Sequence, residues 1–289
     1  MIYVTHGILP MCRAQHISHA LLLPELSFER HLQRRSTKYV CLKQAMAGAG
    51  DALTIDDATH AGFQAAMLAR RYGHAVSWFV NGANVEDGLP YFPFQLSCML
   101  DHTQRSECLF EGRHWGLRSM ADRRAFRFYL KQRYMGMRSQ PEIEQLVGTV
   151  SISTGVDSSA MGRPLATITS AELTAAAAAG VDLQNHSWSH LNPQVLSERT
   201  VTEEVHLNEH YLSHFRNTNF RGFAPAFGKQ VGLPYAVFDL MVLADRDSNS
   251  FHVNARVVNR RELLLAEHGL SAAAPIGADV ADRPAAAMK

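Results

Sequence analysis

The sequence predicts an α/β fold in which parallel strands form a sheet or a barrel. Residues 51–57 and 74–82 have strand composition, and residues 61–73 between them have helical spacing. A strand, a helix and a second strand within about 40 residues are typical of parallel pairing. With 289 residues, 46% of them hydrophobic, the chain can bury the core that such a fold needs.

The remaining segments extend this pattern over most of the chain. We predict helices at residues 28–36, 169–180 and 197–215, and strands at 2–8, 181–190 (ending in a loop or helical turn), 220–228 (with a turn) and 250–258. Residues 89–164 lack this alternation of strands and helices, and they predict an α-helical insertion. We therefore expect one domain over residues 1–270, followed by a disordered, low-complexity tail at 271–289.

The charge balance argues against nucleic acid and against an anionic membrane surface as partners. Lys and Arg number 28 and Asp and Glu 27, which leaves a formal charge of +1. The sequence contains no run of about 18 apolar residues, which a membrane span would need. Its first residues lack the pattern of a signal peptide. The four cysteines show no paired spacing, so we expect free thiols. These observations predict a cytoplasmic protein.

Two acidic residues stand together where a strand-like segment ends, in LTIDDATH (53–60). Adjacent carboxylates repel, and burial pushes both toward protonation unless a cation or firm hydrogen bonds compensate. Asp56 and Asp57 therefore predict a bound cation. The alternative is structural: one acid caps the following helix and the other lies in its first turn.

The sequence NHSWSH (185–190) supplies further ligands for such a cation. His186 and His190 lie four residues apart, so one helical turn would place both imidazoles on the same side. They follow an apolar strand, as the two acids do, and the carboxyl ends of parallel strands meet at one edge. Two histidines and one carboxylate leave positions open for water and substrate. The alternative is a pair of hydrogen-bonded core histidines.

These motifs resemble those of the polysaccharide deacetylase family, which carries the NodB-homology domain and is also called carbohydrate esterase family 4. Residues 54–58 (TIDDA) are similar to its T-F-D-D-G motif, and residues 186–190 (HSWSH) to its H-S/T-x-x-H motif. Residues 223–228 (FAPAFG) resemble a later F-A-Y-P-Y-G stretch, and residues 3–8 (YVTHGI) its first strand. The order and spacing of the motifs agree from residue 2 to about residue 260.

The resemblance implies a distorted (β/α)7-type barrel and a metal-dependent hydrolase. The enzyme would remove an N-acyl group, above all N-acetyl, from an amino sugar, a glycoside or a sugar-containing metabolite. Asp57, His186 and His190 would bind one divalent metal, which is usually zinc (Zn²⁺) in this family. Asp56 would be the general base that takes a proton from the attacking water. The metal and a backbone N–H near Phe227 would stabilise the tetrahedral oxyanion.

The chain departs from the family pattern in its later part. The family's late histidine, its usual general acid, has no clear equivalent, and His6, His252 and His268 are the candidates. Arg221 is a loose stand-in for the family's arginine motif. Trp188, inside the histidine motif, is either a platform on which substrate stacks or a part of the core packing.

A second set of histidines also repeats every four residues, in VHLNEHYLSH (205–214). His206, His210 and His214 lie beside the apolar face of a predicted helix, and no apolar strand leads into that helix. We therefore predict a stripe at the surface or at the boundary of the core. The alternative is a second or adventitious metal site.

Three functions remain open at this point. The first is hydrolysis of an N-acyl group, and the second is hydrolysis of another amide, such as a formamide or a cyclic imide. The third is a barrel that keeps its metal without turnover and serves binding or assembly. The missing acid motif favours the third function, whereas Asp56 argues against it. The sequence does not set the oligomeric state.

Overall fold

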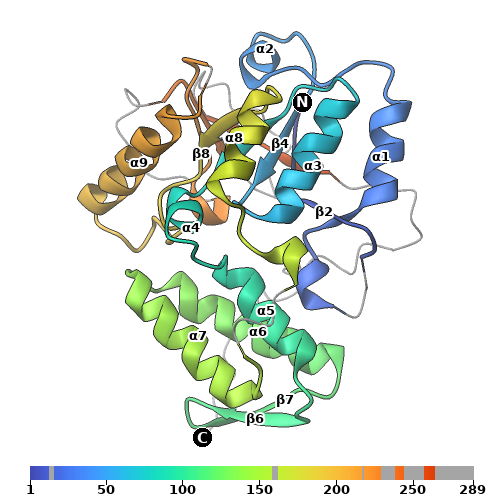
Figure 1. Cartoon of the computed structure of the whole chain (residues 1–289). Helices are drawn as coiled ribbons and strands as arrows, with labels where there is room; N and C mark the ends of the chain where they lie inside the picture. Colours follow the sequence, from blue (N-terminus) through green and yellow to red (C-terminus); the bar gives the residue numbers. More distant parts are fainter. Residues whose placement is uncertain (13–15, 158–161, 217, 229–237, 244–256, 264–289) are drawn as a thin grey trace, which may run out of the picture.

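Figure 1 shows the computed structural model of the chain. The residues that it describes are 1–12, 16–157, 162–216, 218–228, 238–243 and 257–263. The predicted tail at 271–289 lies outside these residues, as do His252 and His268.

Among the described residues, eight strands form one sheet in which every pairing is parallel. The order across the sheet is β11-β10-β9-β8-β5-β4-β1-β12. The bounds are β1 (Ile2–Thr5), β4 (Ala52–Asp56), β5 (Ser77–Val80), β8 (Asp182–Asn185), β9 (Gly222–Phe223), β10 (Leu240–Leu243), β11 (Val257–Asn259) and β12 (Arg261–Glu262). β4 and β5 are buried along their whole length, as expected for parallel strands that are covered on both faces.

The two edges of this sheet meet at Arg260. β11 pairs with β10 at one edge and β12 pairs with β1 at the other, yet only Arg260 separates β11 from β12 along the chain. The backbone N–H of Arg260 donates to the carbonyl oxygen of Leu243 (2.7 Å), and that of Leu263 to Val4 (2.9 Å). The sheet is therefore curled, and β11 and β12 together act as the seventh strand of a distorted barrel. The predicted fold class is confirmed.

Helices lie around the strands of the sheet (Figure 1). They are α1 (Glu25–Arg34), α2 (Leu42–Met46), α3 (His60–Arg71), α4 (Gly82–Glu86), α8 (Ser170–Ala178) and α9 (Glu198–Ser213). The hydroxyl groups of Thr59, Thr169 and Ser197 accept a backbone N–H at the start of α3, α8 and α9. These caps fix where each helix begins, and so they set the length of the loop before it.

Between β5 and β8 the chain forms a separate group of elements in the lower part of Figure 1. They are α5 (Phe92–His102), β6 (Glu107–Phe110), β7 (Arg113–Gly116), α6 (Met120–Met135) and α7 (Gln140–Thr154). The segment predicted as a helical insertion at 89–164 is mainly helical, but β6 and β7 add an antiparallel hairpin. Its helices bury a hydrophobic cluster that includes Leu96, Phe126 and Val150 and that also takes in Ile17 and Leu191 from outside the insertion.

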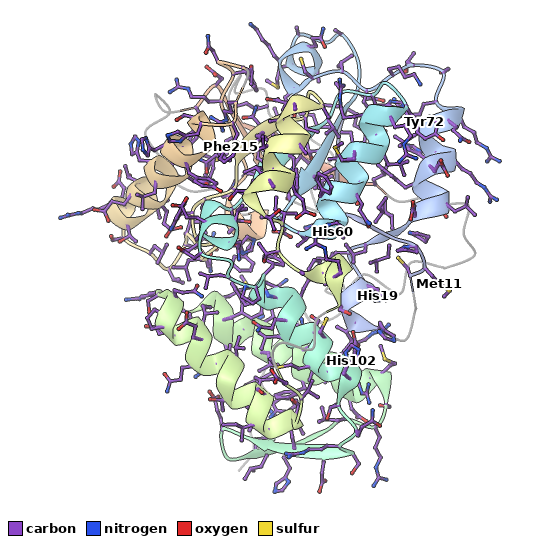
Figure 2. The ribbon with its side chains drawn as sticks, viewed as in Figure 1. Met11, His19, His60, Tyr72, His102 and Phe215 are labelled. Atoms are coloured by element: carbon purple, nitrogen blue, oxygen red, sulfur yellow. The ribbon has the colours of Figure 1, made fainter. Side chains whose placement is uncertain are left out.

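Asp101 in α5 ties this insertion to the N-terminal part of the chain. Its carboxylate accepts the backbone N–H groups of Ile17 (2.7 Å) and Ser18 (2.9 Å) in η1 (Ile17–His19). His19 and His102 mark this junction in Figure 2. These hydrogen bonds hold the C-terminal end of α5 against η1.

Short elements complete the described structure. β2 (Ile8–Leu9) pairs in parallel with β3 (Leu23–Pro24), and η2 (Arg163–Leu165) and η3 (Ala226–Gly228) are short 3-10 segments. All four cysteines are free thiols, as predicted. In the part of the chain that is described, no helix has both the length and the apolar character that crossing a membrane requires.

Candidate active site

The chain leaves strand geometry between the two adjacent acids. β4 ends at Asp56, and Asp57 has a left-handed backbone with a φ of 70°. Successive residues of a strand point to opposite faces, so this break allows both carboxylates to lie near His186, which influences the pKa of each. Both side chains are buried, with 4% of Asp56 and 1% of Asp57 exposed.

Neither acid caps α3, so the structural alternative for this pair does not hold. The cap is Thr59, whose hydroxyl oxygen accepts the N–H of Gly62 (3.1 Å), and the helix begins at His60 (Figure 2). The backbone of Asp57 is held from another strand, because the indole N–H of Trp78 donates to its carbonyl oxygen (2.8 Å). The carboxylate of Asp57 takes part in neither of these contacts.

The two histidines follow β8 in a loop, so the helical turn suggested by their spacing is wrong. Ser187 and His190 have left-handed backbones, with φ values of 65° and 57°, which an α-helical turn excludes. The loop turns both imidazoles toward Asp57. The Oδ1 atom of Asp57 lies 3.4 Å from Nε2 of His186 and 3.5 Å from Nε2 of His190.

Left-handed backbone is concentrated at this site. The non-glycine residues with positive φ in the described ranges are Asp57, Glu111, Ser187, His190 and Phe227. All but Glu111 lie in the motifs that predicted the site. Such conformations are unfavourable in non-glycine residues and persist where the surrounding structure enforces them. Their clustering supports a functional role for these loops.

Hydrogen bonds with Asn81 and Glu204 hold the histidine loop in place. Asn81 donates from Nδ2 to the carbonyl oxygen of His186 (2.6 Å). Glu204 in α9 accepts both the backbone N–H (2.7 Å) and the hydroxyl (2.8 Å) of Ser189. The positions of the two imidazoles are therefore set by neighbours on α9 and at the end of β5.

His186 presents its Nε2 atom to the site. Its Nδ1 lies 2.6 Å from the carbonyl oxygen of Ala224. Because a carbonyl oxygen can only accept, Nδ1 carries the proton, and in the neutral imidazole Nε2 keeps a lone pair. Metal-binding histidines typically bind the metal through one ring nitrogen and donate the N–H of the other to a nearby acceptor.

Asp57, His186 and His190 form a cluster of potential metal ligands. One ligand atom from each lies within 4.8 Å of the others, and no second group of three such residues is found in the described ranges. Both carboxylate oxygens of Asp57 are buried without a hydrogen-bond partner, which is costly for a charged group. A divalent cation would satisfy them, and two imidazole nitrogens with a carboxylate oxygen are a donor set that suits zinc.

Asp56 has a different partner from Asp57. Its carboxylate oxygens accept hydrogen bonds from Nη1 (2.6 Å) and Nη2 (2.7 Å) of Arg260, which is itself buried. Burial would raise the pKa of Asp56, but Arg260 and then His186 lower it to about 2. Asp56 is therefore ionised at neutral pH. Arg221, the stand-in suggested by the sequence, is exposed instead.

The two histidines differ in pKa. Burial lowers the pKa of His190 to about 4, so this imidazole is neutral at pH 7, as a metal ligand must be. Burial also acts to lower the pKa of His186, but the neighbouring carboxylates of Asp56 and Asp57 outweigh it and raise the pKa. The pKa of Asp57 is lowered in spite of burial, because both histidines favour its charged form.

Two other predicted residues also lie at the site. His6 follows β1 and is half-buried, and it acts to lower the pKa of both Asp56 and Asp57. The ring of Phe227 lies against that of His190, with the centroids 5.0 Å apart. The structure thus brings the first strand and the turn after β9 to the same place. His252 and His268, the other two candidates for the general acid, lie outside the described residues.

Trp188 packs between two helices. An added Cβ at Gly82 in α4 would come within 2.3 Å of the Trp188 ring, so only glycine permits this approach. On its other side the ring meets Tyr211 of α9 edge-on, with the centroids 5.7 Å apart. These contacts support packing over a substrate platform.

The second set of histidines lies away from these ligands. His206, His210 and His214 are all exposed on α9 and its end, as predicted. The rings of His210 and His214 meet at a centroid distance of 5.2 Å, but the three do not form a ligand cluster. The surface stripe is therefore the interpretation that fits.

Sequence reasoning missed Tyr91. The phenol oxygen of this buried residue lies 3.3 Å from Nε2 of His190, and Asp57 influences its pKa. Tyr91 precedes α5 in the insertion, outside every motif used to predict the site. Its only signal was an aromatic residue close to the boundary of the insertion.

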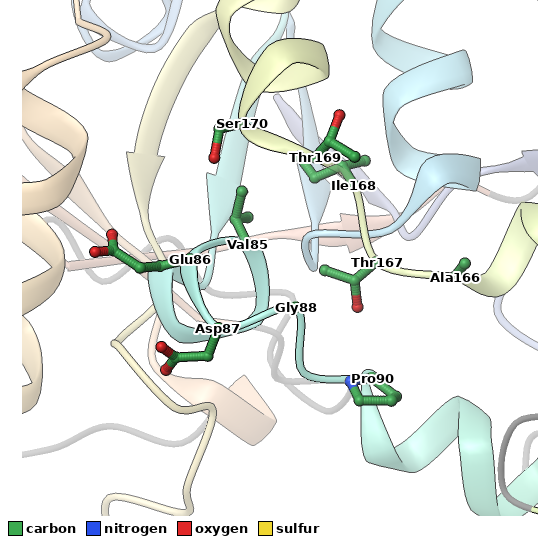
Figure 3. Close-up of a pocket in the computed structure, with 10 residues that line it drawn as sticks. All are labelled: Val85, Glu86, Asp87, Gly88, Pro90, Ala166, Thr167, Ile168, Thr169 and Ser170. Carbon is green, nitrogen blue, oxygen red and sulfur yellow. The ribbon is translucent and has the colours of Figure 1, made fainter.

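A pocket of about 630 Å³ lies beside the site, between α4 and the segment that leads to α8 (Figure 3). It is lined by residues 85–88, 90 and 166–170. None of the candidate ligands lines it, but each wall is joined to a neighbour of a site residue or adjoins one in sequence. On one wall Ile168 donates its N–H to the carbonyl oxygen of Ala58 (3.1 Å), which follows Asp57, and on the other Pro90 precedes Tyr91.

A family model described as polysaccharide deacetylase matches residues 50–233. The chain belongs to the polysaccharide deacetylase family. The match spans both the Asp-Asp motif and the histidine motif, so the resemblance predicted from them is confirmed. Among curated proteins, no sequence matches this member of the family.

Two solved deacetylases share the fold of this polysaccharide deacetylase family member. The Streptococcus pyogenes deacetylase PplD in complex with acetate is 14% identical, with 91% of this chain and 92% of that chain covered and a TM-score of 0.56. The de-N-acetylase from Aggregatibacter actinomycetemcomitans is 10% identical, with 94% and 97% covered and a TM-score of 0.50. At these identities the likeness concerns the fold alone.

Proposed function

We propose that the chain is a metal-dependent amide hydrolase that removes an N-acyl group, in the first place N-acetyl, from an amino sugar, a glycoside or a sugar-containing metabolite. Family membership supports deacetylation, and PplD was solved with acetate, the acid that N-acetyl hydrolysis releases. The observation that carries the proposal is the contrast between two neighbours. The carboxylate oxygens of Asp57 lack hydrogen-bond partners and face two histidines. The carboxylate of Asp56 is instead held in its ionised form by Arg260.

The candidate ligands and Asp56 divide the work. The three ligands would hold one divalent metal, for which zinc suits the donor set, and when bound it polarises a carbonyl group and lowers the pKa of water. Asp56 would take a proton from the attacking water, a role that needs the carboxylate form. Each carboxylate oxygen has a second lone pair, so the salt bridge to Arg260 leaves Asp56 able to accept that proton. A backbone N–H near Phe227 would stabilise negative charge on the carbonyl oxygen.

Hydrolysis by the full chain loaded with Zn²⁺ tests this proposal. The substrates are a panel of N-acetyl amino sugars, a formamide and a cyclic imide. Release of acetate that stops on chelation and returns with Zn²⁺ is the expected result. Hydrolysis of only the formamide or the imide would move the function to another amide. Stoichiometric metal without turnover on the whole panel would overturn the hydrolase and favour a barrel that serves binding.

A further inference from the structure

We propose that Tyr91 is a catalytic residue whose phenol donates a hydrogen bond to the oxygen of the scissile amide as that oxygen gains negative charge. The inference rests on the amide hydrolysis proposed above. Tyr91 belongs to none of the motifs that identify the family, because it lies at the N-cap of α5 in the insertion. The insertion would thus supply a group to the chemistry of the barrel.

The phenol borders the ligand cluster. Its oxygen lies 3.3 Å from Nε2 of His190, the same atom that lies 3.5 Å from Oδ1 of Asp57. The side chain is buried, so the phenol faces the interior of the site and not bulk water. A substrate carbonyl that enters the space next to these ligand atoms comes within reach of the O–H group.

The phenol is available as a donor. A phenol keeps its proton at neutral pH, because its ordinary pKa is about 10. The contact with His190 is long for a hydrogen bond from a hydroxyl group. A cation at Nε2 would take the lone pair of that nitrogen, so His190 would not compete with a substrate oxygen for the O–H.

The surrounding structure fixes the position of the phenol. The ring of Tyr91 meets His190 and Phe94 edge-on, with centroid distances of 5.0 Å and 5.1 Å. Its carbonyl oxygen accepts the N–H of Phe94 (3.0 Å) at the start of α5. Two residues earlier, the carbonyl oxygen of Leu89 accepts the hydroxyl of Thr167 (2.7 Å). A donor that is already in place is what stabilises a developing oxyanion most effectively.

The phenol acts on charge alone during the reaction. Water oxygen forms a bond to the carbonyl carbon, the π pair of the C=O bond moves onto the carbonyl oxygen, and Asp56 takes the proton of the water. Tyr91 donates to the negative oxygen and keeps its own proton. When the electron pair returns, the C–N bond breaks and the amine leaves with the proton from Asp56. The products are a carboxylic acid and an amine, and no other reactant is needed.

Tyr91→Phe tests this role because it removes only the phenol oxygen. We expect Zn²⁺ content and KM close to those of the wild type and a fall in kcat of about 100-fold or more. Tyr39→Phe is the matched control. Tyr39 is also buried, and its phenol lies 2.8 Å from Nε2 of His31, a residue outside the candidate site. The control should keep kcat within about twofold of the wild type.

A second readout does not require turnover. The Zn²⁺-loaded protein is titrated calorimetrically with methylphosphonate, a tetrahedral oxyanion, and Tyr91→Phe should weaken binding about tenfold or more, which Tyr39→Phe should not. Wild-type kcat in Tyr91→Phe, a rise in KM alone, or loss of Zn²⁺ would each overturn the catalytic role. Should the wild type hydrolyse no amide, weaker phosphonate binding by Tyr91→Phe would still support the donor while the proposed hydrolysis fails. Unchanged phosphonate binding would then overturn the donor as well.

Discussion

Arg260 and Asp56 form a buried, two-pronged salt bridge at the point where the barrel closes. The guanidinium nitrogens lie 2.6 Å and 2.7 Å from the two carboxylate oxygens, although 204 positions separate the residues in sequence. Arg260 connects β11 to β12, and Asp56 ends β4. The bridge therefore joins the closing strand to the residue proposed as the general base.

Breaking this bridge from one side should destabilise the protein. We expect Arg260→Met to lower the free energy of unfolding by about 3–5 kcal/mol, because Asp56 stays buried without its partner. The double variant Asp56→Asn/Arg260→Met should recover part of that loss, since no unpaired charge remains. Urea denaturation of the wild type, of Arg260→Met, of Asp56→Asn and of the double variant measures the energy that couples the two residues. Strictly additive effects would show that the two residues do not stabilise each other.

The two adjacent acids should differ in their effect on the metal. Asp56→Asn should keep the metal while kcat falls at least ~100-fold, the scale of a lost general base. Asp57→Asn should weaken metal binding itself, because one of three ligands is lost. Metal content after dialysis, measured beside kcat for both variants, separates the roles. Near-normal turnover in metal-loaded Asp56→Asn would refute the base assignment.

The two sets of histidines should respond differently to substitution. His186→Ala/His190→Ala should leave a folded protein that has lost most of its metal. Replacing His206, His210 and His214 with Gln should keep the metal and change activity less than about tenfold, since these side chains are exposed and outside the ligand cluster. Circular dichroism checks the fold of each. Stoichiometric metal in the double variant, or loss of metal in the triple variant, would show that the metal ligands have been assigned to the wrong histidines.

Asp182, at the start of β8, should make stability depend on pH. Burial raises its pKa in spite of hydrogen bonds from Ser77 (2.9 Å) and Gln184 (2.6 Å). A carboxyl group with a higher pKa in the folded state stabilises at low pH, and this contribution is lost as pH rises through the folded pKa. The Tm of the wild type should therefore fall relative to that of Asp182→Asn as the pH rises from about 3 to about 7. A constant difference across this range would contradict the shift.

The sequence predicted what is local. The strand and helix order follows from the periodicity of apolar residues, and the two motifs could be placed together because parallel strands end at the same edge. Backbone conformation within the motifs was not predictable in this way. The spacing of His186 and His190 fits a helical turn, yet left-handed residues at Ser187 and His190 make a loop that serves the same purpose.

Arg260 and Tyr91 were missed because their contacts are long-range. The partner of Arg260 lies in β4, and that of Tyr91 lies after β8, so no window of the sequence contains both members of either pair. A buried arginine must be paired, but the residue that pairs it is known only once the sheet has curled. Tyr91 also sits in an insertion, where the pattern of the barrel gives no guide.

The closing strand sets a limit on how far this protein can be shortened. A version that ended before Arg260 would have no cation beside Asp56, and burial would then push that carboxyl toward its protonated form. The metal ligands, which come from β4 and from the loop after β8, would all still be encoded. Such a truncated product would hold every ligand and lack a working base, so a shortened derivative must retain Arg260 if its activity is to be tested.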